Sequence, residues 1–259
     1  MGVQSMATTY DHTREAWRDI WLENSDFEQE YGTLSYKRAQ DLFKLYLPYL
    51  TTRDLILEAG CGLGHVVYYL RQRGYNVAGV DYVPEALQPE IAHRLGLPLM
   101  AADVHQLPYA TNSLNAYLSF GVVEHFENGP MAALREAFRV LKPGGVLILT
   151  VPHPNFVESL RNFANRVIPG RLERLGKRAE YYESQPDHRS MAGFIEQAGF
   201  KVERSEPIAH SYTWYGLGPL FRAPGYYKSS ALGEVCGTVS RWLLPWATAF
   251  GSLTIARKP

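Results

Sequence analysis

Apolar positions in the middle of the chain follow two alternating spacings. Short apolar runs typical of strands buried in a parallel sheet occur at residues 54–60, 76–82, 98–103, 114–121 and 144–152. Between them, apolar residues recur every three or four positions over 65–73, 84–95 and 131–141, as in amphipathic helices. This alternation predicts an α/β fold made of parallel βαβ units, with helices on both faces of one sheet. The stretch "KPGG" at 142–145 predicts a turn between the last of these helices and its strand.

The two ends of the chain depart from this rhythm. Residues 1–50 carry helical spacing, as in "REAWRDIWLEN", and Pro48 marks a break. After Pro152, a helix fits "HRSMAGFIEQAGF", strands fit 201–209 and "GSLTIARKP", and the rest shows no clear strand. We therefore expect an N-terminal helical cap over 1–50 and one α/β domain over 51–259. Insertions at about 153–190 and 210–250 could cover the ligand edge of its sheet.

Composition restricts the class of partner and the compartment. The chain has 259 residues with 26 acidic and 26 basic side chains, so nothing in its total charge calls for nucleic acid or an anionic membrane surface, and no nucleic-acid partner is expected. The two cysteines are Cys61 and Cys236; the first lies in a glycine turn, which favours a reducing cytoplasm over a disulfide framework. The N-terminus lacks the apolar core of a signal peptide, and the late run "WLLPWATAF" is too short to span a bilayer, so no transmembrane segment is expected.

The stretch "LILEAGCGLGHVVYYL" at 55–70 joins a strand pattern to a helix pattern through three glycines. A triphosphate loop needs a lysine and a hydroxyl residue after its last glycine, and neither follows Gly64. A dinucleotide fingerprint needs glycine at its sixth position, where this chain has His65. Glu58 precedes the turn, and its carboxylate would repel a pyrophosphate but favour a cationic ligand.

"EAGCGLG" resembles the acid-x-Gly-x-Gly-x-Gly first motif of the class I S-adenosylmethionine-dependent methyltransferases. The segments "VAGVDY", "AADVHQLPY", "LSFGVVEHF" and "VLKPGGVLILTVP" resemble the later motifs in the same order, over roughly residues 50 to 152, with a weaker echo at 188–208 and 251–257. The resemblance implies a doubly wound, Rossmann-like, mostly parallel sheet of seven strands, with "GSLTIARKP" as an antiparallel last strand. It also implies S-adenosyl-L-methionine as cofactor and S-adenosyl-L-homocysteine as product.

The same resemblance assigns roles to individual residues. Asp81 would accept from both ribose hydroxyls, Asp103 would accept from the adenine amino group, and the Val104 amide would lie at a ring nitrogen. No metal ion is implied. The full cofactor-binding set that we expect is Glu58, Gly60, Cys61, Gly62, Gly64, Asp81, Tyr82, Asp103, Val104 and Phe120.

Histidines are the candidate bases, because a hydroxyl acceptor must lose a proton near neutral pH. His125 and His153 follow the fourth and fifth predicted strands at the edge where acceptors bind in this family, and they are our candidate catalytic residues. Each could equally be a surface or structural residue. His188 and His210 lie in or near the insertions, and His12 could close over the cofactor.

The insertions contain three further patterns whose interpretation stays open. Arg161, Arg166, Arg171, Arg174, Lys177 and Arg178 could clamp an anionic acceptor or form a solvated helix face. Tyr212, Trp214, Tyr215, Phe221, Tyr226 and Tyr227 could line an acceptor site, or belong to a core or a subunit contact. "RWLLPWATAF" could be a buried helix, a dimer surface, or a patch that touches a membrane for a lipid acceptor.

Our leading functional hypothesis is methyl transfer to a small-molecule acceptor, at a hydroxyl oxygen. Alternatives are transfer to nitrogen or carbon of a small or lipid-like acceptor, a protein or RNA acceptor, an NAD-dependent dehydrogenase, and a non-catalytic protein that binds the cofactor as a partner or regulator. A homodimer is compatible with all of these. The place of the Asn/Asp-Pro-Pro-Tyr/Phe motif of many nucleic-acid amino methylases reads "SFGVVEHF" here, which argues against a nucleic-acid base as acceptor.

Overall fold

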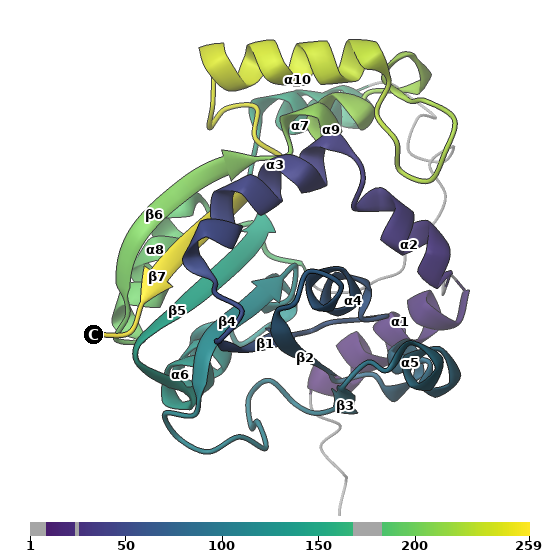
Figure 1. Cartoon of the computed structure of the whole chain (residues 1–259). Coiled ribbons are helices and arrows are strands. Elements are labelled where there is room, and N and C mark those ends of the chain that lie inside the picture. The colour runs from purple at the N-terminus through teal and green to yellow at the C-terminus, as the bar shows by residue number, and fades with distance from the viewer. Residues whose placement is uncertain (1–8, 24–25, 168–182) are drawn as a thin grey trace, which may run out of the picture.

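The computed structural model describes residues 9–23, 26–167 and 183–259, which form a sheet with helices on both faces (Figure 1). Within these residues, seven strands form one sheet in the order β3-β2-β1-β4-β5-β7-β6. All strands run parallel except β7, which is antiparallel to both β5 and β6. The strands are β1 (Leu55–Ala59), β2 (Asn76–Asp81), β3 (Leu99–Ala101), β4 (Leu114–Phe120), β5 (Leu141–Pro152), β6 (Lys201–Ile208) and β7 (Gly251–Arg257). The expected doubly wound sheet with an antiparallel last strand is confirmed.

Helices precede the sheet, connect its strands and extend beyond its edge. The N-terminal helices are α1 (Thr9–Glu23), α2 (Phe27–Thr33) and α3 (Lys37–Tyr46), and the connecting helices are α4 (His65–Arg71), α5 (Pro89–Leu95), α6 (Met131–Val140) and α8 (His188–Gln197). The later segments add α7 (Phe156–Val167), α9 (His210–Tyr215) and α10 (Ala231–Leu243). Short 3₁₀ turns lie at Leu47–Tyr49, Pro84–Leu87, Val123–His125 and Pro219–Phe221.

The apolar strands are buried on both faces, as a parallel sheet requires. On one face Leu57, Tyr117 and Leu147 pack with residues of α6 and α8. On the other face Ile56, Leu118 and Ile148 pack with residues of α3 and α4. Successive residues of a strand point to opposite faces, so two neighbouring apolar residues in one strand serve two separate cores.

The order in which the strands are connected marks one edge of the sheet as the place for a ligand. The chain runs from β1 outward to β2 and β3, then returns to place β4 on the other side of β1. Strand order therefore reverses between β1 and β4, which is the place where ligands bind in open α/β sheets. The glycine turn follows β1 at that point.

Residues 142–145 were expected to form a turn before the strand, but they lie inside β5. The pairing of β4 with β5 shifts from Leu114–Leu141 to Ala116–Val146, so the intervening residues bulge out of the ladder, and Gly144 takes a φ of +78°. The glycine and proline therefore produce a bulge that interrupts the strand without ending it.

The segment 210–250, in which no clear element was expected, contains α9 and α10. α10 packs with Gly233, Gly237 and Ser240 buried, whereas its larger apolar residues are exposed. This reversal of the usual helix pattern explains why its periodicity was not recognised. The interpretation of "RWLLPWATAF" as a buried helix is wrong, because Trp242 in it is 83% exposed.

The sheet core gives a stability test within one strand. We expect Leu57→Ala to lower the free energy of unfolding by about 2–5 kcal/mol, because the Leu57 side chain is fully buried and its truncation leaves a cavity. Leu55→Ala is the matched control, since Leu55 lies two residues away and is 41% exposed. Denaturant titration of both variants makes the comparison, and equal losses would contradict the assigned core.

Candidate functional site

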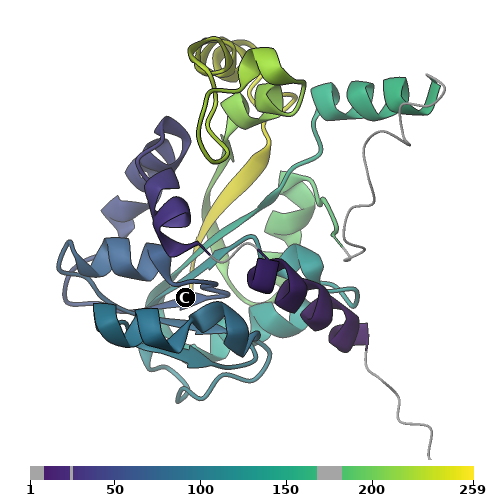
Figure 2. The ribbon, with the colours of Figure 1, turned by 90° about the vertical axis from the view of Figure 1, so that its right-hand side faces the viewer.

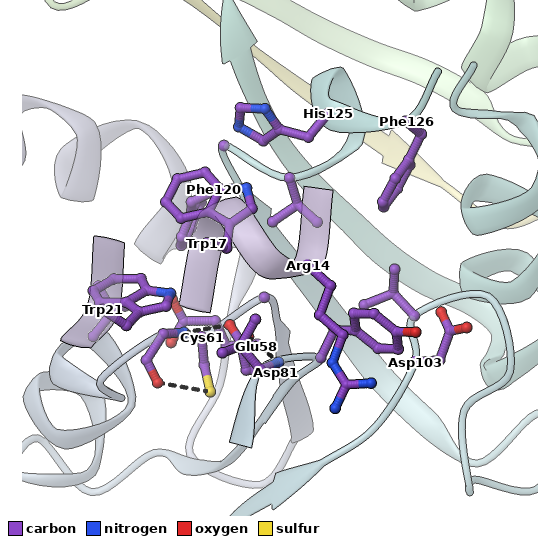
Figure 3. A pocket seen from close by; sticks show the side chains of 18 of the residues that line it. Arg14, Trp17, Trp21, Glu58, Cys61, Asp81, Asp103, Phe120, His125 and Phe126 are labelled. Atoms are coloured by element: carbon purple, nitrogen blue, oxygen red, sulfur yellow. Dashed lines mark hydrogen bonds between the residues drawn. The ribbon is translucent and has the colours of Figure 1, made fainter. Parts of the chain in front are cut away.

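A cavity of about 300 Å³ lies at the carboxyl ends of β1, β2 and β4, where the strand order reverses (Figure 3). This volume is at the lower end of the range for small-molecule sites, roughly 300–1,000 Å³. Its lining comes from the ends of strands, the turns after them, the start of α4, and α1: Arg14, Trp17, Trp21, Glu58, Gly60, Cys61, Gly62, His65, Val66, Asp81, Tyr82, Val83, Asp103, Val104, Phe120, Gly121, Val122, His125 and Phe126. Nine of the ten expected cofactor-binding residues line it. Gly64 does not; it stands at the N-terminus of α4 instead.

Backbone hydrogen bonds fix the glycine turn against β2. The amides of Gly60 and Cys61 donate to the Val80 carbonyl oxygen at 2.8 and 2.9 Å. The Gly62 amide donates to Oδ2 of Asp81 at 2.8 Å. Gly62 has a φ of +50°, and a Cβ there would lie 2.8 Å from the Trp21 ring, so position 62 has no room for a side chain.

Asp81 is buried at the end of β2 and accepts bonds with both carboxylate oxygens. Oδ1 accepts from the Val83 amide at 2.9 Å, while Oδ2 accepts from Gly62. Burial raises the pKa of this carboxyl, and the backbone donors oppose that rise. Each carboxylate oxygen can accept a second bond, so the pair of oxygens retains the capacity to hold a vicinal diol.

Glu58 is buried beside Asp81 at the centre of the cavity (Figure 3). Burial, and then the negative charge of Asp81, raise the pKa of Glu58 to about 8. Among the described residues, no hydrogen-bond partner contacts its Oε2 atom. Glu58 is therefore largely protonated at neutral pH until a cation compensates its charge, and this unsatisfied carboxyl oxygen fits a cationic ligand.

Residues after β2 and β3 form one side of the cavity. Asp103 accepts at Oδ1 from the His105 amide at 2.8 Å, and the same oxygen lies 2.8 Å from His105 Nδ1. These contacts orient the carboxylate at the cavity edge next to Val104, which is buried. Tyr82 lies under the Arg14 guanidinium, with 5.0 Å between the Arg14 Cζ atom and the ring centroid.

Of the residues in α1, only His12 was considered for the site from the sequence, yet three others form one wall of it. Trp17 and Trp21 stack at a centroid distance of 6.0 Å and line the cavity together with Arg14. Arg18 pairs with Glu85 at 2.9 Å, which ties α1 to the turn after β2. The two tryptophans are four residues apart, a spacing that places them on one helix face and was the available signal.

The two candidate bases lie in different places. His125 is buried, lines the cavity with the three acids, and meets the Trp17 ring edge-on at 5.0 Å. His153 is not among the lining residues: its Nε2 lies 3.2 Å from His188 Nδ1, and its ring lies 5.2 Å from that of Trp246. The structure thus places His125, and not His153, with the expected cofactor-binding residues.

Buried groups near these histidines also have shifted pKa values. Burial raises the pKa of Glu124, the residue before His125, to about 8. Burial and the neighbouring His188 lower the pKa of His153. His65, at the start of α4, has its pKa lowered to about 4 by burial, so it is neutral at pH 7 and brings no positive charge to the glycine turn.

Of the residues proposed for acceptor binding, those that the structure describes lie outside the cavity lining. Arg161 pairs with Glu158 at 2.7 Å and donates to the Gly216 carbonyl oxygen at 3.4 Å. Arg171, Arg174, Lys177 and Arg178 fall outside the described residues, as do the side chains of His12 and Arg166. His210 lies 2.8 Å, through Nε2, from the Pro245 carbonyl oxygen, a contact within the late insertion.

The late aromatic residues connect α9 and its loop to other helices. Tyr226 donates to Glu30 Oε1 on α2 at 3.0 Å, and the Arg38 guanidinium on α3 lies 4.9 Å from the Tyr212 ring centroid. Trp214 donates through Nε1 to Ser240 Oγ on α10 at 3.1 Å. These contacts give the aromatic residues a packing role, while their use toward an acceptor stays a prediction.

The described residues form neither a metal cluster nor a membrane-spanning helix. No group of three or more His, Cys, Asp or Glu side chains there could hold a metal ion. None of the helices in this part of the chain has both the length and the apolar character needed to cross a membrane.

Comparison with known proteins identifies the central segment. Residues 57–149 match the family model described as a methyltransferase domain. A malonyl-[acyl-carrier protein] O-methyltransferase of Dechloromonas aromatica is 31% identical over 158 residues, which cover 60% of this chain and 56% of that protein. A ubiquinone/menaquinone biosynthesis C-methyltransferase of Roseobacter denitrificans is 28% identical over 166 residues, covering 56% of this chain and 66% of that protein. The chain thus spans less than two thirds of the length of either relative.

A solved structure shares the whole architecture. It is the 1,6-didemethyltoxoflavin-N1-methyltransferase of Burkholderia thailandensis, with bound 1,6-didemethyltoxoflavin and S-adenosylhomocysteine. It superposes with a TM-score of 0.61 at 15% identity, covering 99% of this chain and 93% of the other. At this identity the likeness establishes the fold.

The crowding at Gly62 gives a binding test. We expect Gly62→Ala to weaken binding of S-adenosylhomocysteine by tenfold or more, about 1.4 kcal/mol, because the new Cβ would collide with Trp21 and disturb the turn that Asp81 holds. Calorimetric titration measures the affinity. Gly129→Ala is the control, since Gly129 also has a positive φ but has open space around it. Partial recovery in Gly62→Ala/Trp21→Leu would assign the loss to the collision, and unchanged affinity in Gly62→Ala would contradict the assignment.

The raised pKa of Glu58 gives a proton-linkage test. Below pH 8 the ligand-free carboxyl is protonated, so binding of a cation that favours the ionised form must release a proton. We expect S-adenosylmethionine affinity to rise close to tenfold per pH unit between about pH 6 and 7.5, levelling above about 8. At pH 6.5, calorimetric titrations of the wild-type protein in buffers of different ionisation enthalpy should show about one proton released per bound ligand. In Glu58→Gln the proton that Glu58 releases should be absent. Equal release in both proteins would exclude Glu58 as the source.

Proposed function

We propose that this chain, which contains a class I S-adenosylmethionine-dependent methyltransferase domain, transfers a methyl group from S-adenosylmethionine to a small-molecule acceptor. The observation that carries the proposal is one cavity in which Glu58, Asp81 and Asp103 surround a glycine turn. Such a site suits a nucleoside that carries positive charge and no phosphate. An NAD-dependent dehydrogenase is disfavoured, because Glu58 and the non-glycine residue His65 occupy the region where a pyrophosphate would approach.

The residues of the cavity divide into three binding roles. Glu58, with its unpaired buried oxygen, would face the cationic part of the cofactor. Asp81 would accept from the ribose hydroxyls, and Asp103 with the Val104 amide would hold the adenine. When bound, the cofactor supplies a methyl group on a sulfonium centre with a good leaving group. Trp17, Trp21 and Phe120 line the same space and would exclude water from it.

We propose a hydroxyl oxygen as the acceptor atom and His125 as the base that receives its proton. His125 is buried, lies in the turn after β4 and lines the cofactor cavity. An oxygen acceptor must lose a proton during transfer, whereas an amine need only arrive neutral. For His153 to act as the base instead, the acceptor would have to reach the His153–His188 pair.

Transfer to carbon or nitrogen is the alternative within this reaction class. The relatives are named as an O-methyltransferase and a C-methyltransferase, and the matching structure is named as an N-methyltransferase. The same sheet therefore supports attack by three kinds of atom. The ubiquinone/menaquinone relative also supports a lipid-like acceptor as a candidate class.

A non-catalytic binding protein is the alternative of another class. It would retain the cavity and bind S-adenosylmethionine without forming S-adenosylhomocysteine. We favour an enzyme because a buried imidazole and a cavity wall from α1 add features that cofactor storage does not need. We also propose a cytoplasmic location, for which the free thiols of Cys61 and Cys236 are the support.

The function is tested by supplying the protein with S-adenosylmethionine and a panel of acceptors: carboxylic acids, phenols and hydroquinones, and amines. Appearance of S-adenosylhomocysteine with a carboxylic acid or phenol supports transfer to oxygen. Tight cofactor binding without product across the panel favours the binding protein, and binding of NADH in its place contradicts the proposal.

Replacement of the candidate base separates chemistry from binding. We expect His125→Asn to lower kcat about 10²–10⁴-fold, the usual contribution of a general base, while S-adenosylhomocysteine affinity stays within threefold. His93→Asn is the control, because His93 is exposed on α5. Wild-type turnover in His125→Asn would exclude His125 as the base and favour an amine or carbon acceptor.

A further inference from the structure

α10 packs on the protein with its smallest residues and exposes its largest. Gly233, Gly237 and Ser240 are buried, and a Cβ on Gly237 would lie 2.5 Å from the Ser211 amide nitrogen of α9. The outward side chains are Leu232, Val235, Val239, Trp242 and Leu243, all exposed. Close packing through small residues, with large apolar residues outside, is typical of helices in apolar surroundings.

α7 shows the same reversal. Phe156 and Phe163 are 67% and 65% exposed, and Leu160 between them is also exposed. The charged residues Glu158 and Arg161 instead face the protein, where they pair at 2.7 Å and Arg161 reaches the Gly216 carbonyl oxygen. A helix in contact with water would place these two sets the other way round.

α7 and α10 border one apolar groove. It measures about 890 Å³ and is lined by residues of both helices, among them Phe156, Leu160, Val235, Val239 and Leu243. α7 and α10 both lie at the top of the molecule in Figure 1, and Figure 2 shows them apart from each other, with α7 projecting to the right. Apolar patches of this kind on a water-soluble surface mark interaction sites.

The charge of this region favours an anionic bilayer over a second copy of the chain as the partner of this surface. Arg161 and Glu158 pair with each other, and the other described charged side chains of this region are Arg222, Lys228, Arg241 and Glu234, an excess of two positive charges in a chain whose net charge is zero. Two copies meeting through this face would bring like charges together. An anionic bilayer would attract the basic side chains and accept the apolar ones.

We propose that the outer face of α7 and α10 is a peripheral docking surface for an anionic lipid bilayer. The exposed phenylalanines, leucines and valines enter the boundary between headgroups and acyl chains. Trp242, at the end of α10, lies at headgroup level, where tryptophan is enriched in membrane proteins. Arg222, which lines the groove, and the exposed Lys228 contact lipid phosphates. This surface is separate from the cofactor cavity, with which it shares no lining residue.

The test is co-sedimentation with vesicles, with neither cofactor nor acceptor present, so that its result is independent of methyl transfer. We expect vesicles of phosphatidylcholine with phosphatidylglycerol to bind at least tenfold more tightly than phosphatidylcholine alone, and raised salt to weaken that binding. Tryptophan emission should shift to shorter wavelength on binding, and Trp242→Phe should remove most of the shift.

Two substitutions on the proposed surface and one beside it provide the matched comparison. Val239→Glu and Phe163→Glu should each weaken vesicle binding at least tenfold. Thr238→Glu adds the same charge one residue away, on a side chain that faces Lys37 and Arg38 of α3, and should stay within twofold of wild type. Calorimetry with S-adenosylhomocysteine, unchanged in all three, verifies that they fold.

Three outcomes would overturn the proposal. One is the absence of binding to anionic vesicles at millimolar lipid. A second is equal binding by wild type, Val239→Glu and Phe163→Glu. The third is a monomer–dimer equilibrium in ultracentrifugation that Val239→Glu abolishes in a protein without vesicle affinity, which would assign the surface to a second copy of the chain.

Discussion

The site depends on the two backbone hydrogen bonds that Asp81 accepts. One comes from Gly62 in the turn after β1 and the other from Val83 in the turn after β2, so a single carboxylate fixes two neighbouring strand ends. This arrangement places the free end of the glycine turn against Trp21 and holds Glu58 beside a second acid.

The cavity brings acidic side chains together, and their burial disfavours the ionised form. Two carboxyl groups within it have raised pKa values, and Glu58 is raised to about 8 by burial with the adjacent Asp81. Placing two ionised acids together in a desolvated space costs free energy, which the folded chain recovers when a cation enters. In the ligand-free state, uncompensated buried carboxyl groups therefore lie at the place where the positive charge of the ligand would bind.

Sequence patterns predicted the sheet and nine of the residues that line the cavity, because both depend on short local segments. Strand burial follows from runs such as that of β1, and the turn residues Gly60, Gly62 and Asp81 follow directly from strand ends. The wall formed by Arg14, Trp17 and Trp21 of α1 was missed, because a wall contributed by a distant helix leaves only a pair of tryptophans as its signal. His153 and His125 both follow strands, yet only tertiary packing shows that one lines the cavity and the other faces His188. α10 was missed because its buried positions are two glycines and a serine.

The two irregular insertions both leave the sheet on the side of β5, β6 and β7, whereas the glycine turn and its acids belong to β1, β2 and β4. The antiparallel β7 brings the chain back from α10 into the sheet. Both ends of the late insertion are therefore attached to strands that are remote from the glycine turn. The architecture is consequently modular. Exchange of residues 209–250 for another loop would alter what the molecule meets at its outer surface while the half that holds the nucleoside keeps its supports.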